Sequence, residues 1–235
     1  KVLTSIRFTV VFVVVSMILH VILGVCLALI LNMKFKGRRF LRTIVLIPWA
    51  MPAVVVGMAA KWAFNNDYGL INDFIRWFVH GYQNSWLINT GSARAAVIAM
   101  DLWKDLPFFA ILVLSGLQFI SGDIYEAAKV DGANGIQTFF KITLPMLSPM
   151  LKIILMLAIT GAFKDYESIM VLTNGGPNNR TQVMFLYIYQ LIFGKDVGTN
   201  PQIGYATVLS LVAALIIGIV TAVYMYFARK LDEVV

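Results

Sequence analysis

Five long, uninterrupted runs of apolar residues constrain the fold of this chain more than any other feature. Each run is long enough to cross the hydrocarbon core of a bilayer as a helix, which takes about 20 residues. Hydrophobic residues make up 60% of the chain and charged residues only 13%. Because the runs are continuous rather than alternating, the sequence predicts an all-α integral membrane protein and not a barrel. The predicted spans cover roughly residues 6–31, 44–64, 94–120, 146–170 and 203–227.

Lysine and arginine residues in the short connectors predict which side of the membrane each connector faces. The connector at about 65–93 carries one arginine and no lysine, so we expect it outside. Alternation then places 121–145 inside, 171–202 outside and the C-terminal tail "ARKLDEVV" inside. The strongest cytoplasmic mark is the first connector, with Lys34, Lys36, Arg38, Arg39 and Arg42.

The same alternation places Lys1 outside, and none of the runs is typical of a cleavable signal peptide. We therefore expect at least one further membrane helix before Lys1. No external segment is long enough to form its own core, so residues 1–235 are predicted to form one transmembrane domain. Within the spans, Pro48, Pro52 and Pro107 are expected to kink their helices rather than to act as hinges.

Several classes of function lack support in the sequence. The net charge of +7 follows mainly from the cytoplasmic bias, and no compact basic patch indicates nucleic acid as a partner. The single cysteine, Cys26, gives neither a disulfide framework nor a cysteine metal site. No HExxH or Ser/His arrangement is present, so we predict no catalytic residue, no metal and no cofactor in this chain. His20 and His80 stand alone, without a predicted role.

The segment "YEAAKVDGANGIQTFFKITLP", residues 125–145, is too long and too patterned for a plain connector. Asp123 and Glu126 form a variant of the capping box, which predicts the start of a helix. Gly132 is expected to end that helix in the left-handed conformation. A second short amphipathic helix is expected over "IQTFFKI", and Pro145 is expected to begin the next span.

This compact helix–turn–helix, within residues 121–145, has two interpretations. The small side chains of Ala127 and Ala128 would let another protein approach closely. Alternatively, the two helices form an amphipathic pair that only lies on the membrane surface.

The spacing of Glu126-Ala127-Ala128, Gly132 and Leu144-Pro145 resembles the EAA loop of binding-protein-dependent ABC importer permeases. Further stretches resemble the carbohydrate subfamily of these permeases, which includes the maltose and glycerol-phosphate permeases. The ending "ARKLDEVV" resembles the first, maltose-permease-F-like, subunit of such pairs. The family has six core spans in this half, against five predicted here. The stretches are "RTIVLIPWAMP" (42–52), "YGLIN" (68–72), "LTNGGPNNRTQ" (172–182) and "GYATVLS" (204–210).

The resemblance implies a mechanism in which the EAA loop is a coupling helix that docks in a groove of a cytoplasmic ATPase. ATP closes two ATPase subunits, and the pore switches from inward-open to outward-open. The chain has no G-x-x-x-x-G-K-[ST] phosphate loop, so ATP and Mg²⁺ are expected on the ATPase chains. The coupling residues that the resemblance implies are Glu126, Ala127, Ala128, Asp131, Gly132, Leu144 and Pro145.

The resemblance also implies further partners and a location. These are a second permease subunit, two ATPase subunits, an extracytoplasmic substrate-binding protein and the lipid bilayer of a bacterial or archaeal plasma membrane. Gly175, Gly176 and Pro177 are expected to face the binding protein. A different class of protein, an ion-coupled secondary transporter or channel, remains the alternative.

Charged residues in the third predicted span form the candidate substrate pathway. Asp101, Lys104, Asp105 and Phe108 fall at i, i+3, i+4 and i+7, on one face of a helix. Charges at this depth are costly and usually face the bundle interior or a water-filled cavity. Together with Asp165 in the fourth span, these positions match the pocket of the family that the chain resembles.

Two interpretations of this cluster remain open. In the first, carboxylates accept hydrogen bonds from sugar hydroxyls, while Trp103 or Phe108 stacks on a sugar ring. In the second, the charges form an interhelical ion network, for example Lys104 with Asp165, that only fixes the packing of the helices.

Overall fold

The computed structural model describes residues 1–194 and 200–232, and across these residues the chain is built from helices, without a strand. The predicted all-α membrane bundle is therefore confirmed. Lys195 of the predicted external connector and the last residues of the predicted cytoplasmic tail lie outside the described residues. In chain order the helices are α1 (Val2–Asn32), α2 (Arg38–Val45), α3 (Ile47–Ala50), α4 (Ala53–Ala63), α5 (Leu70–Arg76), α6 (Thr90–Gln118), α7 (Gly122–Val130), α8 (Gly135–Thr138), the π-helical η1 (Phe139–Thr143), α9 (Leu144–Lys164), α10 (Glu167–Thr173), α11 (Met184–Phe193) and α12 (Ile203–Asp232).

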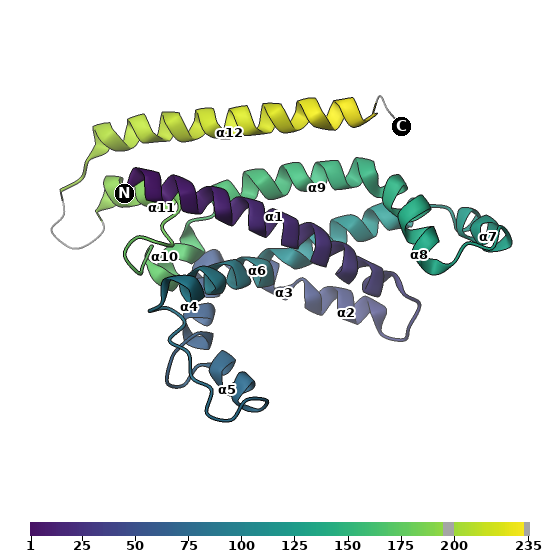
Figure 1. The fold of residues 1–235 in the computed structure, drawn as a ribbon, viewed down its shortest axis with the longest axis horizontal. Helices are drawn as coiled ribbons and strands as arrows, with labels where there is room; N and C mark the ends of the chain where they lie inside the picture. The colour runs from purple at the N-terminus through teal and green to yellow at the C-terminus, as the bar shows by residue number, and fades with distance from the viewer. Residues whose placement is uncertain (195–199, 233–235) are drawn as a thin grey trace.

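Three long helices, α1, α6 and α9, pack together in the centre of the bundle, and α12 lies along α9 and α11 at its edge (Figure 1). Two buried apolar clusters fill the interior. One includes Phe12 and Leu172, and the other includes Leu31, Leu117 and Leu147. The outward face of α12 remains apolar and exposed, as expected for a helix that faces lipid.

The number of spans depends on whether two regions are counted: the bent segment α2–α4 and the charged helix α6. Three helical stretches of the described chain are long and apolar enough to cross a membrane: Val2–Asn32, Gly135–Lys164 and Ile203–Lys230. The bent pair Arg38–Ala50 and Ala53–Ala63 makes a fourth if it is taken as one span. The third predicted span, residues 94–120, corresponds to α6, which has the required length, 29 residues, but carries the charged cluster described below.

The second predicted span, residues 44–64, is not one helix, and its expected kink is a complete break. α3 and α4 belong to segments that meet at 95°. Met51 at the break is extended, with φ −78° and ψ 143°. A residue before proline is pushed away from helical geometry by the proline ring, and Pro52 follows directly. Pro48, in contrast, lies in the first turn of α3, where its missing N–H costs nothing.

The fourth predicted span, residues 146–170, is wrong at both ends. The helix begins at Gly135 and ends at Lys164, so the expected separate helix over "IQTFFKI" is the first part of the span. The two parts join through η1, where the N–H of Leu144 bonds the carbonyl of Phe139, five residues earlier. Since Pro145 has no N–H and its ring crowds the carbonyl four residues earlier, a widened turn at this point accommodates it without a break.

Asn72 organises the connector between α4 and α6, and sequence reasoning did not identify it. Its side chain is fully buried. Its amide nitrogen donates to the carbonyls of Asn66 and Asn84, each at 3.1 Å, and its amide oxygen accepts from the indole N–H of Trp86 at 2.9 Å. Next to it, a side chain at Gly69 would collide with the backbone of Asn65. These contacts explain Gly69 and Asn72 of the "YGLIN" stretch.

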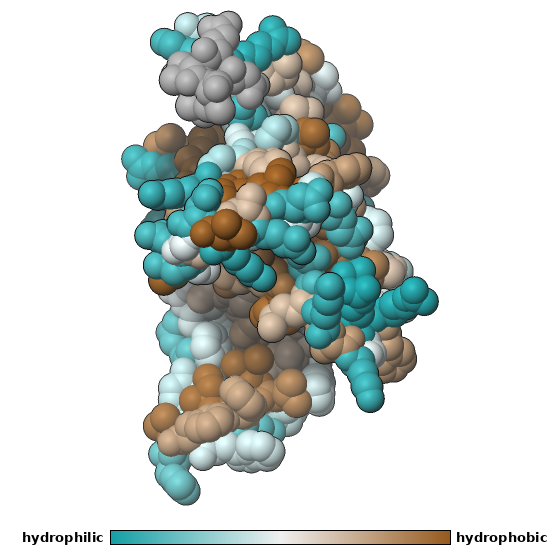
Figure 2. Space-filling model, turned by 90° about the vertical axis from the view of Figure 1, so that its right-hand side faces the viewer, coloured by the Kyte–Doolittle hydropathy of each residue, from teal (hydrophilic) through white to brown (hydrophobic). Residues whose placement is uncertain are grey.

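The connectors separate onto two ends of the bundle, as alternation predicts. The link between α1 and α2, the segment α7–α8 and the C-terminal end of α12 lie at one end, whereas α10, α11 and the N-terminus lie at the other (Figure 1). Seen from the first end, hydrophilic residues gather over much of the surface (Figure 2). Arg42 also fastens α2 to α1 here, because its Nη2 donates to the carbonyl of Leu31 at 2.8 Å.

Candidate functional site

The charged residues of α6 do not share one environment. Asp101 is buried, with 2% of its surface exposed. Lys104 and Asp105 are partly buried and pair with each other, with Nζ 3.0 Å from Oδ1 and 3.2 Å from Oδ2. A direct ion pair between Lys104 and Asp165 is not found among the described residues, because the salt bridge of Lys104 is to its own neighbour Asp105. Both carboxylate oxygens of Asp165 accept instead from the hydroxyl of Ser168, at 2.9 and 3.0 Å.

Asp101 faces α1, where it meets a histidine for which no role was predicted. Nε2 of His20 lies 3.9 Å from Oδ2 of Asp101, which is beyond hydrogen-bond distance. The His20 ring packs against Phe109, with 4.7 Å between the ring centroids. One sequence feature could have predicted this contact. Ser16 precedes His20 by four residues, so the two side chains form a polar face on an otherwise apolar helix.

The aromatic residues near this cluster also separate. Phe108 stacks on Trp49 of α3, with ring centroids 4.9 Å apart and an interplanar angle of 8°. Trp49 keeps 45% of its surface exposed, and it lies just before the break between α3 and α4. Trp103 instead lines a hollow of about 470 Å³ with residues of α4 and α5, including Leu70. The aromatic surface beside Lys104 and Asp105 is therefore made by Phe108 and Trp49.

Residues 121–145, here named the coupling loop, run from the N-cap of α7 through α8 and η1 into the first turn of α9. A compact turn joins α7 to α8. The expected cap at Asp123 is wrong, because Ser121 is the N-cap and its hydroxyl accepts from the N–H of Asp123. Gly132 has φ 78°, the left-handed conformation that was predicted. The N–H groups of Gly132 and Ala133 bond the carbonyls of Lys129 and Ala128, at 3.1 and 2.9 Å, which is the Schellman arrangement.

The second half of the coupling loop has its own cap. The side chain of Asn134 accepts from the N–H of Gln137, and the side chain of Gln137 accepts from the N–H of Asn134, each at 2.9 Å. This reciprocal pair is a capping box that the sequence analysis did not identify. The hydroxyl groups of Tyr125 and Thr143 lie 3.3 Å apart and connect α7 to η1.

The predicted coupling residues differ in exposure. Glu126, Ala127, Asp131, Gly132 and Pro145 are exposed, and Leu144 is half-buried. Ala128 is buried, with 5% of its surface exposed. Another protein can therefore approach closely at Ala127, whereas Ala128 packs inside the loop.

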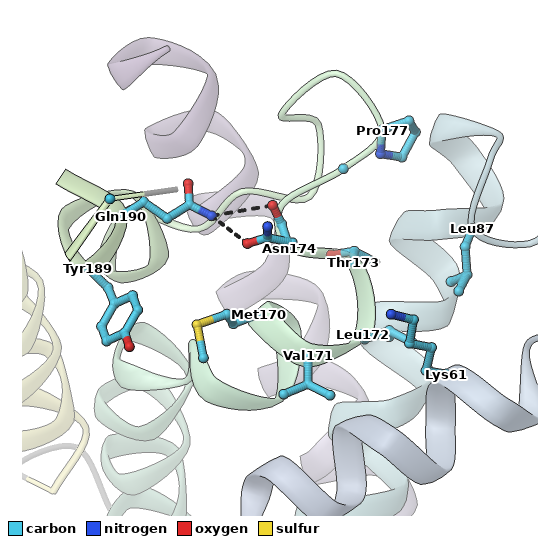
Figure 3. A pocket seen from close by; sticks show the side chains of 12 residues that line it. Lys61, Leu87, Met170, Val171, Leu172, Thr173, Asn174, Pro177, Tyr189 and Gln190 are labelled. Carbon is cyan, nitrogen blue, oxygen red and sulfur yellow. Dashed lines mark hydrogen bonds between the residues drawn. The ribbon is translucent and has the colours of Figure 1, made fainter. Parts of the chain in front are cut away.

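The loop that contains Gly175, Gly176 and Pro177 is held by a chain of side-chain amides, of which Gln182 and Gln190 are buried and Asn174 is exposed. Gln190 of α11 donates Nε2 to Oδ1 of Asn174 at 2.8 Å (Figure 3). Gln182 donates to Oε1 of Gln190 at 2.6 Å and accepts from the hydroxyl of Ser5 on α1. Gly175 has φ 80°, and a side chain there would press against Gln182. This loop is thus fixed to two helices of the bundle.

These features define a class of protein before any comparison is made. The chain is a multi-helix membrane protein with partly buried charges, a stacked aromatic pair of which Trp49 is exposed, and an exposed, capped turn at one end. No group of three or more metal-ligating side chains is found in the described part of the chain.

Comparison with known proteins assigns the family. Residues 6–233 match the model of the binding-protein-dependent transport system inner membrane component. The chain belongs to this family, and it is an inner-membrane component that crosses the membrane several times.

Named relatives cover most of the chain. It is 40% identical over 180 residues to the trehalose/maltose transport system permease protein MalF of Thermococcus litoralis, covering 77% of this chain and 61% of that protein. It is 33% identical over 232 residues to the multiple sugar-binding transport system permease protein MsmF of Streptococcus mutans, covering 99% and 78%. The chain thus spans less than two thirds of the Thermococcus relative.

A solved structure has the same fold. The crystal structure of a bacterial ABC transporter involved in the import of the acidic polysaccharide alginate matches with a TM-score of 0.85 at 24% identity, covering 97% of this chain and 79% of that chain.

Proposed function

We propose that this chain is the transmembrane permease subunit of an ATP-driven importer for a saccharide or polyol. It would form half of the translocation pore beside a second permease subunit. The observation that carries the proposal is the coupling loop, which presents Glu126, Ala127 and Gly132 on a stiff turn at one end of the bundle. A turn held by two caps and a Schellman motif is suited to transmit force from a docked protein.

The geometry suggests how motion at the coupling loop would reach the pore. α7 follows directly after α6, and the helix from Gly135 to Lys164 runs continuously from the loop to Asp165. At 1.5 Å per residue this helix is roughly 45 Å long. A displacement of the loop would therefore move Asp165 and the α6 cluster together. ATP binding by the partner would shift the population between two pore states.

The substrate class follows from the residues in the bundle and from the relatives. The pair of Lys104 and Asp105 offers charged hydrogen-bonding groups, and Trp49 with Phe108 offers a flat aromatic surface. The names of the relatives refer to trehalose, maltose and multiple sugars, which favours a saccharide.

The remaining partners complete the proposed importer. Two cytoplasmic ATPase subunits would hold ATP and Mg²⁺ and would dock on the coupling loop, and the second permease subunit would complete the pore. An extracytoplasmic binding protein would deliver the saccharide near Gly175, Gly176 and Pro177. A related transporter was solved in complex with an alginate pentasaccharide-bound periplasmic protein, and this chain matches it with a TM-score of 0.79.

One observation suits the alternative, an ion-coupled transporter. His20 and Asp101 form a buried titratable pair between α1 and α6, and such pairs occur in proton relays. However, a secondary transporter has no use for a docking turn of the kind found in the coupling loop, and the assigned family is binding-protein-dependent. The importer is therefore the better-supported function.

Copurification followed by reconstitution tests the proposal. The tagged full-length protein is isolated from its native membrane in mild detergent, its partners are identified by mass spectrometry, and the complex is placed in proteoliposomes. We expect an ATPase and a second permease to co-elute, and saccharide uptake to require ATP and resist a protonophore. Uptake by the chain alone, abolished by the protonophore, would establish the ion-coupled alternative.

A further inference from the structure

A hollow of about 630 Å³ is lined by residues of α4, of α10 with the residues that follow it, and of α11 (Figure 3). α10 and α11 lie at the end of the bundle opposite the coupling loop (Figure 1). A hollow of this size is within the range of sites that bind small molecules. Gly176 and Pro177 also line it, so it adjoins the loop that is expected to face the binding protein, whereas neither the substrate pathway nor the coupling loop includes it.

One wall of this hollow is fixed before any ligand arrives. Gln190 is buried, and its amide is fully used between Asn174 and Gln182. The ring of Tyr189 is held between Tyr166 and Phe193, with centroid distances of 5.3 and 4.8 Å. Because a pre-ordered site loses little conformational entropy on binding, this wall favours ligand binding.

Two polar groups of the hollow are not used within the described part of the chain. The ammonium group of Lys61 makes no described ion pair or hydrogen bond, and neither does the hydroxyl group of Tyr189. Lys61 is also the one charged residue among those described as lining the hollow. A cation without a carboxylate beside it can form a charge-assisted hydrogen bond with an anionic ligand.

The hollow is connected to the substrate pathway through one short helix. α10 begins beside Asp165 and Ser168 and ends at Thr173, where Asn174 lines the hollow. Its seven residues span roughly 10 Å. α10 is also held tightly, because Gly57 of α4 lies so close that a side chain there would meet the carbonyl of Ser168 at 2.8 Å. A ligand in the hollow would therefore sit one short helix away from Asp165.

We propose that this hollow is an outer subsite for an acidic saccharide, meaning one that carries a carboxylate, sulfonate or phosphate group. The acidic group pairs with Lys61, the sugar ring packs on Tyr189, and the side chain of Asn174 offers hydrogen bonds to hydroxyl groups. This inference rests on the proposed importer function and specifies its substrate class.

Uptake kinetics test this inference in the complete reconstituted importer with its binding protein. The probes are a uronate disaccharide and the neutral disaccharide of the same linkage, each over a range of concentrations. For Lys61→Gln we expect the KM for the uronate to rise about threefold to fivefold, the upper end of the effect of one exposed ion pair, with kcat unchanged. The KM for the neutral sugar stays the same, and Lys61→Arg restores the wild-type KM for the uronate.

Lys36→Gln is the matched control, because it removes the same charge from the exposed connector at the other end of the bundle. It should leave both KM values unchanged. Uptake of only the neutral disaccharide by the wild type would overturn the inference, as would an equal effect of Lys61→Gln on both sugars. Failure of the wild type to take up either disaccharide with ATP would also overturn the inference, whereas the importer function is tested separately by copurification with an ATPase and a second permease.

A second measurement tests whether the hollow receives an acidic side chain of the binding protein instead of the saccharide. Binding protein loaded with either disaccharide is mixed with the proteoliposomes, and the bound fraction is measured by flotation. If Lys61→Gln weakens the binding of both loaded forms equally, the hollow receives the binding protein and the inference is overturned. We expect no change in either bound fraction.

Discussion

The coupling loop and the charged cluster of α6 are organised in opposite ways. The coupling loop is exposed and held almost entirely by contacts within about 25 residues, such as Asn134 with Gln137 and Gly132 with Lys129. The cluster is buried or half-buried and depends on residues distant in sequence, such as His20 and Trp49. A local device that docks a partner can keep its geometry while the bundle rearranges, whereas the cluster must change when its helices move.

The largest expected effect comes from breaking the turn of the coupling loop. Gly132→Val places a β-branched residue at φ 78°, which costs about 1–2 kcal/mol and distorts the docking surface. We expect ATP-dependent uptake to fall by more than tenfold while the variant remains in the membrane. Gly122→Val is the control, because Gly122 lies in the same loop without a left-handed φ and with open space around it. Normal uptake by Gly132→Val would show that this turn has no mechanical role in transport.

The next effect separates substrate binding from packing in the cluster. Asp105→Ala leaves the half-buried ammonium of Lys104 without its partner, and an unpaired charge at this depth is strongly unfavourable. We expect uptake to fall about tenfold with assembly intact. If the pair serves only packing, the double variant Lys104→Ala/Asp105→Ala should recover uptake; if it contacts the saccharide, uptake remains low. Measurement of all four proteins gives the coupling between the two residues.

A smaller effect is expected at the aromatic surface. Trp49→Ala removes one ring of the stacked pair with Phe108, and stacking contributes about 0.5–1.5 kcal/mol. The KM for the saccharide should rise about twofold to tenfold, with little change in kcat. Trp77→Ala removes the same side chain from an exposed position in the connector that follows α5, and it should not change the KM. Equal effects of the two variants would indicate a general role for aromatic residues at the membrane boundary.

The smallest effect on transport, with a clear effect on stability, is expected at Asn72. Asn72→Ala leaves the indole N–H of Trp86 and two carbonyls without their partner, at a cost of about 1–3 kcal/mol. The thermal unfolding temperature in detergent should fall by several degrees, while uptake per folded molecule stays near wild type. Asn89→Ala is the control, because Asn89 precedes α6 without a side-chain cap. An unchanged unfolding temperature for Asn72→Ala would mean that this hub is dispensable.

The same comparison explains what the sequence could predict. Gly132 was predicted correctly because its left-handed turn is a local requirement, and the apolar runs followed from composition. The cap at Ser121, however, was assigned to Asp123, since both residue types can cap and only the backbone decides. Even in the coupling loop, the continuous helix through η1 was not foreseen, because Pro145 normally indicates a helix start.

The arrangement of the cluster lay beyond the sequence for a different reason. The i, i+3, i+4 spacing placed Asp101 and Lys104 on one helix face, but it does not say which neighbouring helix each meets. Asp101 turns to α1, while Lys104 pairs with Asp105 instead of Asp165. These partners depend on how α1, α3 and α9 pack around α6, and that packing includes the 95° break at Pro52. No local sequence pattern predicts how these helices pack.

Site-specific cross-linking tests the central claim most directly, namely that the coupling loop docks on a separate ATPase. Cys26 is first replaced by serine, and Ala127→Cys then places a single thiol on the exposed face of α7. In the copurified complex we predict a cross-link between this thiol and the ATPase chain, which is absent when Trp77→Cys carries the thiol in the connector that follows α5. A transport-active complex whose ATPase cross-links to Trp77→Cys and never to Ala127→Cys would contradict the account.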